Sequence, residues 1–188
     1  VVLFPAEEWV DGNGKRHATS ERWVHGTKEV PKDFITTFTL RRQYIGQFEL
    51  LAAVCVYYSL KEELRGRHVV HYIDNTSSRA ARVKGYSRAF DSARIVHAFH
   101  AWNAGIRVSS WFEYVRSKAN IADLPSRSEF GYLHSLGSTL VDTILPDIEE
   151  WTASARDWMD KAEMSAGPVD ETGKRGRKRK RGGRRAGP

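Results

Sequence analysis

Along the middle of this chain, segments whose apolar residues have the spacing of a helix alternate with segments that have the pattern of a strand. This order limits the possible folds more than any other feature of the sequence. The alternation runs over four segments: 45–64, 67–74, 88–103 and 106–114. In the first, Leu50, Val54 and Tyr57 follow the i, i+4, i+7 pattern of an amphipathic helix. The second is a short apolar run that predicts a buried strand. Helices alternating with strands predict an α/β fold, a mixed sheet flanked by helices.

The N-terminal part is richer in strand and turn signals. Residues 1–4 predict a short apolar strand, and the segment 23–25 is a second candidate strand within a polar, turn-rich stretch. Residues 11–14 (DGNG) are typical of a hairpin turn or loop. The segment 34–40 is rich in β-branched and aromatic residues, which predicts a strand.

The chain divides into three parts by composition. Residues 1–130 carry the alternating pattern and predict one α/β domain. Residues 131–164 predict a helical extension, with two helices joined at Pro146 because proline interrupts a helix. Residues 165–188 lack apolar periodicity and are rich in Gly, Arg and Lys, so we expect a disordered basic tail.

Charge is concentrated in that tail. The chain has a net charge of +7, but nine basic residues between 174 and 185 account for it, and the remainder has 21 basic and 23 acidic residues. These nine are Lys174, Arg175, Arg177, Lys178, Arg179, Lys180, Arg181, Arg184 and Arg185. Such a run is typical of a nuclear import signal or a nonspecific nucleic-acid contact. The charge therefore does not require a basic surface on the folded part.

Cysteine content and hydropathy indicate the compartment. Cys55 is the only cysteine, so the chain cannot form an internal disulfide, and we interpret Cys55 as a small buried apolar residue. No segment approaches the roughly 20 apolar residues needed to cross a bilayer. The first residues, VVLFP, lack the features of a signal peptide. We therefore expect a location in the nucleus or cytoplasm.

Three acidic residues stand at the ends or faces of separate predicted elements. Glu49 lies on the first helix, Asp74 at the carboxyl end of a buried strand, and Asp123 in the first turn of a helix that Asn120 is expected to cap. Carboxylates that cluster repel one another unless a cation neutralises them. Oxygen-only ligands suit Mg²⁺ or Mn²⁺, and two such ions about 3.5–4 Å apart can catalyse phosphodiester cleavage.

The segments around these acids carry a family resemblance. Residues 44–53 (YIGQFELLAA), 71–77 (HYIDNTS) and 117–127 (SKANIADLPSR) resemble three motifs of the ribonuclease H-like domain that follows reverse transcriptase in many retroelements. Residues 85–87 are also similar to that group. The resemblance covers about residues 1–127, and the last motif is its most specific part.

The resemblance implies a fold and an activity. It implies a five-stranded mixed sheet with helices on both sides, and metal-dependent hydrolysis of the RNA strand of an RNA–DNA hybrid. By motif match, Glu49, Asp74 and Asp123 would ligate a two-metal Mg²⁺ or Mn²⁺ site. The implied partners are an RNA–DNA hybrid, recognised by backbone shape and the 2′-OH, and an upstream reverse transcriptase domain.

Two departures from the family pattern bear on activity. The family's first carboxylate lies on an opening strand, before the strand matched to residues 1–4, and that opening strand is missing here. Asp11 is the only candidate to replace this carboxylate, although no strand is expected next to it. Many members also carry a histidine before the last aspartate, whereas residues 116–119 contain none. We therefore expect this chain to be weakly active or inactive by itself.

Two alternatives remain open. The chain can be a noncatalytic retroelement remnant that binds nucleic acid through its tail, or a relative of integrases and resolvases. The latter usually have a final Glu on a long helix, which Asp123 followed by Pro125 does not match. His97 and His100 are interpreted as a surface or half-buried pair rather than a zinc site, and Trp102 and Trp111 as core residues.

Overall fold

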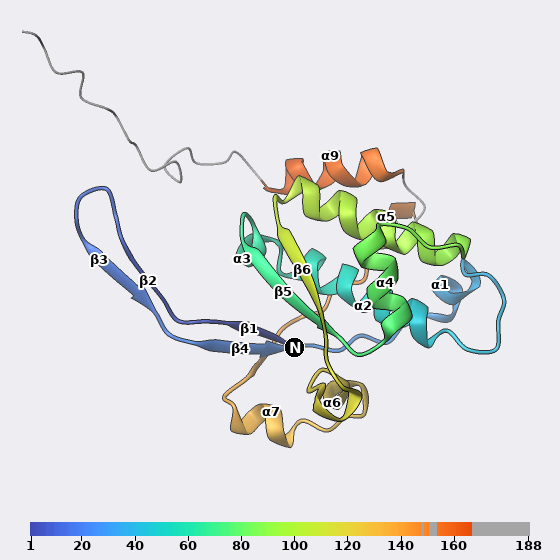
Figure 1. Cartoon of the computed structure of the whole chain (residues 1–188), viewed down its shortest axis with the longest axis horizontal. Helices are drawn as coiled ribbons and strands as arrows, with labels where there is room; N and C mark the ends of the chain where they lie inside the picture. Colours follow the sequence, from blue (N-terminus) through green and yellow to red (C-terminus); the bar gives the residue numbers. More distant parts are fainter. Residues whose placement is uncertain (148, 151–153, 167–188) are drawn as a thin grey trace, which may run out of the picture.

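The computed structural model describes residues 1–147, 149–150 and 154–166. It shows a mixed α/β protein in which helices pack behind a short parallel pair of strands and a strand hairpin projects to one side (Figure 1). The strands are β1 Val2–Phe4, β2 Glu7–Val10, β3 Arg16–Thr19, β4 Arg22–His25, β5 His68–Ile73, β6 Ser109–Tyr114 and β7 Thr139–Leu140. The helices are α1 Lys32–Thr36, α2 Ile45–Ser59, α3 Lys61–Leu64, α4 Thr76–Lys84, α5 Phe90–Gly105, α6 Asp123–Ser126, α7 Gly131–Ser135 and α9 Ala155–Ala166, with a 3-10 turn at Ser117–Ala119.

The described strands form three small sheets, not the five-stranded mixed sheet that the resemblance implied. Their orders are β1-β4-β7, β2-β3 and β5-β6. β5 and β6 are parallel, with His68 opposite Ser109 and Ile73 opposite Tyr114. β4 pairs antiparallel with β1 and parallel with β7, so a segment beyond residue 130 completes the N-terminal sheet.

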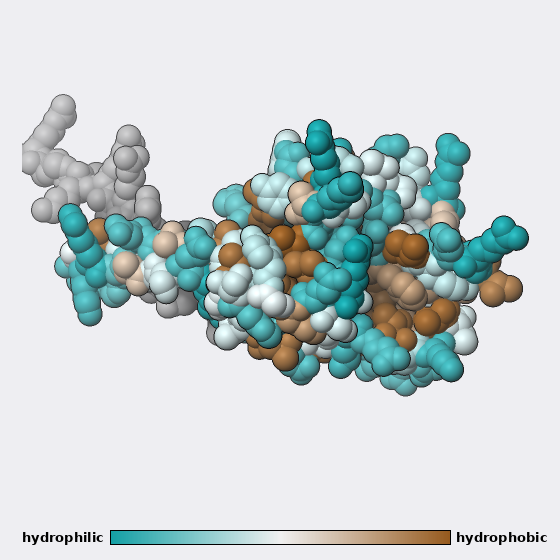
Figure 2. All heavy atoms as spheres, turned by 90° about the horizontal axis from the view of Figure 1, so that it is seen from below, coloured by the Kyte–Doolittle hydropathy of each residue, from teal (hydrophilic) through white to brown (hydrophobic). Residues whose placement is uncertain are grey.

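The two strands of the β2–β3 hairpin were not predicted from the sequence. We expected no strand beside Asp11, and this was wrong: β2 and β3 flank it and pair from Glu7–Thr19 to Val10–Arg16. Asp11 accepts hydrogen bonds from the backbone N–H groups of Asn13 and Lys15, which closes the turn. The hairpin extends away from the body and its surface is largely hydrophilic, whereas apolar surface gathers on the body (Figures 1 and 2).

The core lies between α2, α5 and the inner face of the β5–β6 sheet. Val54, Ile95 and Val96 are completely buried where α2 crosses α5. From the strands, Phe112 packs its ring 5.8 Å from that of Phe99 on α5. Burial of this apolar area, at about 25 cal/mol per Å², is the main force that holds these elements together.

The strand predicted over residues 34–40 is wrong, because residues 34–36 belong to a helix and residues 37–40 form no strand. The segment 34–40 begins inside α1, because Pro31 precedes the helix and Asp33 lies in its first turn, where an acid is favourable. Phe34 and Phe38 are both buried, with ring centroids 5.9 Å apart. Their i, i+4 spacing outweighs the β-branched residues between them.

The predicted helix over 45–64 is confirmed but broken at Leu60 into α2 and α3. The hydroxyl of Ser59 donates to the carbonyl of Cys55, which favours a bend, and also accepts from the backbone N–H of Ile144. The helices predicted after Asn75 and from residue 88 are present as α4 and α5. Asn75 caps α4 through the N–H groups of Ser77 and Ser78.

Of the two helices predicted to meet at Pro146, the one before the proline is wrong; residues 149–150 after it are helical, and residues 148 and 151–153 lie outside the described residues. Residues 141–147 form no helix, and the backbone N–H of Val141 continues from β7 to bond the carbonyl of His25. α9 packs along α5 instead, and it includes residues 165 and 166, which we had assigned to the disordered tail. Gly105 permits this approach, because a Cβ there would lie 2.4 Å from that of Ala162. Residues 167–188 lie outside the described residues.

No helix within the described ranges is long and apolar enough to span a membrane.

Candidate functional site

Of the three acids predicted from the sequence, Asp74 at the carboxyl end of β5 lies within electrostatic range of each of the other two. Asp74 directly follows β5, Glu49 lies in α2, and Asp123 is the first residue of α6. The charge of Asp74 raises the pKa of both Glu49 and Asp123. Asp74 therefore interacts electrostatically with an acid on each side, from elements that are far apart in the sequence.

Glu49 is the most constrained of the three. Burial is the largest cause that raises its pKa, and the charge of Asp74 adds to it, while Ser78, Asn75 and Arg82 act in the opposite direction. Its Oε2 atom is nevertheless buried without a hydrogen-bond partner of good geometry among the described residues. A buried carboxylate oxygen without a partner carries a desolvation cost that a hydrogen-bond donor or a cation would remove.

Asp123 is more exposed, with 31% of its side chain accessible to solvent. Burial and the charge of Asp74 raise its pKa, and Arg127, whose Nη2 lies 3.7 Å from Oδ2, lowers it. The predicted capping role of Asn120 was wrong: Ala122 is the N-cap of α6, and Asn120 donates to Asp123 Oδ1 at 3.0 Å instead. Asn120 thus orients the carboxylate directly.

α4 fixes the relative positions of these elements, through residues that sequence reasoning missed. The hydroxyl of Ser78 donates to the carbonyl of Gly46 in α2, and Arg79 Nε donates to the carbonyl of Phe112 in β6. Arg82 is 2% exposed and donates from Nη2 to the main-chain carbonyl of Glu49. The i, i+3 spacing of Arg79 and Arg82 puts both on one helix face, but sequence alone assigns arginines to solvent.

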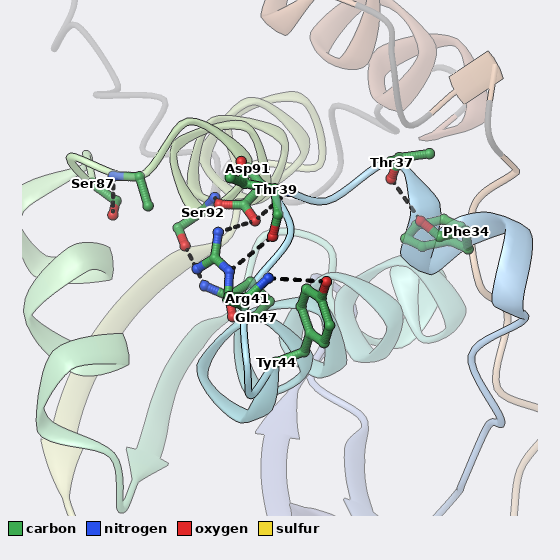
Figure 3. A network of polar contacts seen from close by, with 10 residues as sticks. Phe34, Thr37, Thr39, Arg41, Tyr44, Gln47, Ser87, Asp91 and Ser92 are labelled. Atoms are coloured by element: carbon green, nitrogen blue, oxygen red, sulfur yellow. Dashed lines mark hydrogen bonds and ion pairs between the residues drawn. The ribbon is translucent and has the colours of Figure 1, made fainter.

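A second buried network holds the loop before α2, as Figure 3 shows. Asp91, 2% exposed at the start of α5, forms an ion pair with Arg41 and accepts from the backbone N–H of Thr39. Gln47 in the first turn of α2 donates to Ser92 Oγ at 2.8 Å. The first turn of α2, the helix that carries Glu49, and the loop before it are therefore both hydrogen-bonded to α5.

Removing Asp91 is expected to destabilise the protein. Asp91→Ala removes the acceptor of Arg41 and of the Thr39 and buried Ser92 backbone N–H groups, which costs about 3 kcal/mol and lowers Tm by about 9 °C. Urea and thermal unfolding measure this. The matched control is Asp160→Ala, which breaks the exposed Arg156–Asp160 pair and should change stability by less than about 0.5 kcal/mol. Equal effects of the two variants would contradict the structural role of Asp91.

The donor set partly fits a divalent cation. All three acids supply oxygen, which suits Mg²⁺ or Mn²⁺, and Glu49 Oε2 lacks a partner. However, within the described part of the chain no three His, Cys, Asp or Glu side chains come close enough together to hold one metal ion. Asp74 interacts electrostatically with Glu49 and with Asp123, but the three carboxylates together do not form a metal site.

The remaining candidates lie elsewhere. Asp11 is in the turn of the projecting hairpin, where His17 Nε2 lies 3.0 Å from its Oδ2, and the structure does not bring it to the other acids (Figure 1). His97 is exposed and His100 half-buried, as expected, with a ring nitrogen of His100 2.9 Å from the carbonyl of Arg82. Cys55 is buried as predicted, and burial raises the pKa of its thiol to about 12.

The predictions for Trp102, Trp111 and the basic tail differ in how the structure bears on them. Trp102 is 1% exposed and belongs to the core as predicted. Trp111 is 67% exposed, so its assignment to the core was wrong. The tail cations from Lys174 to Arg185 lie outside the described residues.

Comparison with protein-family models, curated protein sequences and solved structures finds no match to this chain.

The pKa directions at Glu49 predict how stability responds to pH without divalent cations. Because the folded protein holds this proton more tightly than the unfolded chain does, stability falls as pH rises from the ordinary value of 4.5 through the raised pKa. Glu49→Gln removes this loss and should stabilise the metal-free protein at neutral pH by about 1 kcal/mol, since partial solvation limits the gain. Urea unfolding at several pH values tests this. A variant whose stability declines with pH as steeply as that of the parent protein would refute it.

Proposed function

We propose that this chain is the ribonuclease H-like part of a retroelement polyprotein, and that it acts in metal-dependent hydrolysis of the RNA strand of RNA–DNA hybrids. The observation that carries the proposal is the electrostatic coupling of Asp74 to both Glu49 and Asp123. The same three residues were selected beforehand by motif match. Acids from separate elements whose pKa values are raised by burial and by the charge of a neighbouring acid are typical of functional sites.

In this proposal Glu49, Asp74 and Asp123 are the ligands of one or two Mg²⁺ or Mn²⁺ ions, and binding requires the three side chains to move closer together than they lie in this structure. When bound, the ions would activate water and stabilise the leaving oxygen. The protein's own contribution is positional. Arg82 holds the main chain at Glu49, Asn120 orients Asp123, and burial raises the pKa of Glu49.

The chain by itself is proposed to be weakly active or inactive. No three acids in the described residues are close enough together to hold a metal ion, and Asp11 lies in the distant hairpin. The proposed partners are an RNA–DNA hybrid and, in an intact element, a reverse transcriptase domain of the same polyprotein. The nucleus or cytoplasm is the proposed location.

The test uses a labelled RNA annealed to DNA, with Mn²⁺ and the protein in excess. We expect Mn²⁺ to bind at the carboxylates, and cleavage to be slow or absent. Fast, Mg²⁺-dependent turnover that Asp74→Asn abolishes would overturn the claim of weak activity. Absence of Mn²⁺ binding would overturn the metal site itself.

A second candidate is a noncatalytic remnant that binds nucleic acid through its basic tail. The open arrangement of the three acids favours it over an intact nuclease. The tail residues in question are Lys174, Arg175, Arg177, Lys178, Arg179, Lys180 and Arg181. For this candidate, Asp74→Asn leaves nucleic-acid binding unchanged, whereas neutralising the tail removes nucleic-acid binding and its steep salt dependence.

A further inference from the structure

The β5–β6 sheet has one face buried by helices and one face open to solvent. On the inner side, the rings of His71 and Phe112 contact Phe99 of α5. On the outer side, Val70, Tyr72 and Trp111 are 54%, 61% and 67% exposed. We call these three residues the aromatic face. Their exposure follows from the two-residue period of the strands, and no described element covers them.

The aromatic face is compact and ordered. Val70 is directly opposite Trp111 in the parallel register, and Tyr72 is one diagonal step away. Trp111 Nε1 donates to Glu113 Oε1 at 2.6 Å, which fixes the indole and leaves most of the side chain accessible. An ordered, exposed tryptophan beside a tyrosine can stack planar rings with little loss of conformational entropy.

Cations stand at both ends of β6. Arg107 precedes the strand, and Arg116 and Lys118 follow it. All three are exposed, and none forms an ion pair within the described part of the chain. The six residues of β6 span about 20 Å. Aromatic rings flanked by cations match the alternating bases and phosphates of a nucleic-acid strand.

We propose that the outer face of β5–β6 binds single-stranded nucleic acid. Bases stack on Tyr72 and Trp111, and phosphates contact Arg107 at one end and Arg116 and Lys118 at the other. Stacking of this kind tolerates any base sequence, because every base has a π face. The site requires neither a metal ion nor hydrolysis, so it stands independently of the proposed nuclease activity.

The test is binding of a fluorescein-labelled oligothymidylate of about 12 nucleotides to the full chain, followed by fluorescence anisotropy. Trp111→Ala is expected to weaken binding about 5- to 100-fold, and Tyr72→Ala by a similar factor, with little change in the salt dependence. Replacing Arg116 and Lys118 together by Ala should reduce the slope of log K against log salt by about 1.4. Tyr132→Ala is the matched control, since Tyr132 is 55% exposed on α7, away from the sheet.

A direct readout separates this surface from the tail. An oligonucleotide that contains 5-bromouracil is cross-linked by light, and the modified peptides are identified by mass spectrometry. We expect cross-links at Trp111 or Tyr72. Cross-links confined to residues 174–185, with unchanged affinity of Trp111→Ala, would overturn the proposal. So would loss of self-association in Trp111→Ala without loss of oligonucleotide binding, because the face would then be a protein interface.

Discussion

Asp74→Asn is expected to weaken Mn²⁺ binding by at least about 100-fold, the upper range for loss of a supporting residue around a metal ligand. The substitution keeps the size of the side chain and removes the charge that interacts with both Glu49 and Asp123. Isothermal titration with Mn²⁺ measures the affinity directly. Paramagnetic broadening of NMR signals near residues 49, 74 and 123 locates the ion.

The same variant has a second consequence that needs no metal. Because the charge of Asp74 raises the pKa of Glu49 and of Asp123, its removal should lower both. Carboxyl ¹³C titration of the metal-free protein follows both groups. Asp142→Asn, at an exposed aspartate outside the cluster, should change neither the affinity nor the pKa values. If Asp74→Asn behaves like Asp142→Asn in both measurements, the three acids do not form one site.

Trp102→Ala is expected to destabilise the protein by about 4 kcal/mol, which corresponds to a fall of about 12 °C in Tm. Trp102 is 1% exposed in the middle of the helical layer. Its ring lies 4.6 Å from that of Tyr58 on α2 and 5.9 Å from that of Trp158 on α9, and its Nε1 donates to the carbonyl of Tyr57. Truncation therefore opens a cavity between three helices and leaves a buried acceptor without its donor.

Trp102→Phe separates the two contributions. It retains most of the packing and loses the hydrogen bond, so it should cost about 1–2 kcal/mol. Trp111→Ala is the matched control, because the side chain is exposed and its loss should change stability by less than about 0.5 kcal/mol. Chemical unfolding of the three variants measures these differences. A loss at Trp102→Ala no larger than at Trp111→Ala would show that α2, α5 and α9 do not depend on this residue.

Local sequence was sufficient where one element's own pattern decides its structure. The apolar spacing of α2, the capping signal of Asn75 and the left-handed turn at Gly85, with φ of 73°, all lie within a few residues of what they specify. Asp74 at the end of β5 and Asp123 in the first turn of α6 were predicted for the same reason. These signals also selected the three acids of the candidate site.

Local sequence failed where a partner distant in the chain decides the outcome. The segment 34–40 has strand propensity, but burial of Phe34 and Phe38 in the core favours a helical turn. Trp111 has the same side chain as Trp102, but it lies on the exposed face of the β5–β6 sheet. Which face of that sheet is exposed depends on where α2 and α5 pack. Arg82 is buried because α4 contacts α2, α5 and β6.

By itself, then, the sequence determined which residues form the main helices and strands and which acids are candidates for metal binding, because helix periodicity, caps and turns depend on neighbouring residues. Tertiary structure alone decided that Asp74 interacts with Glu49 and Asp123, that Asp11 lies apart in a hairpin, and that one face of β5–β6 is open. The physical reason is that charge interactions and burial depend on distances through space between elements, and the order of residues along the chain does not specify those distances.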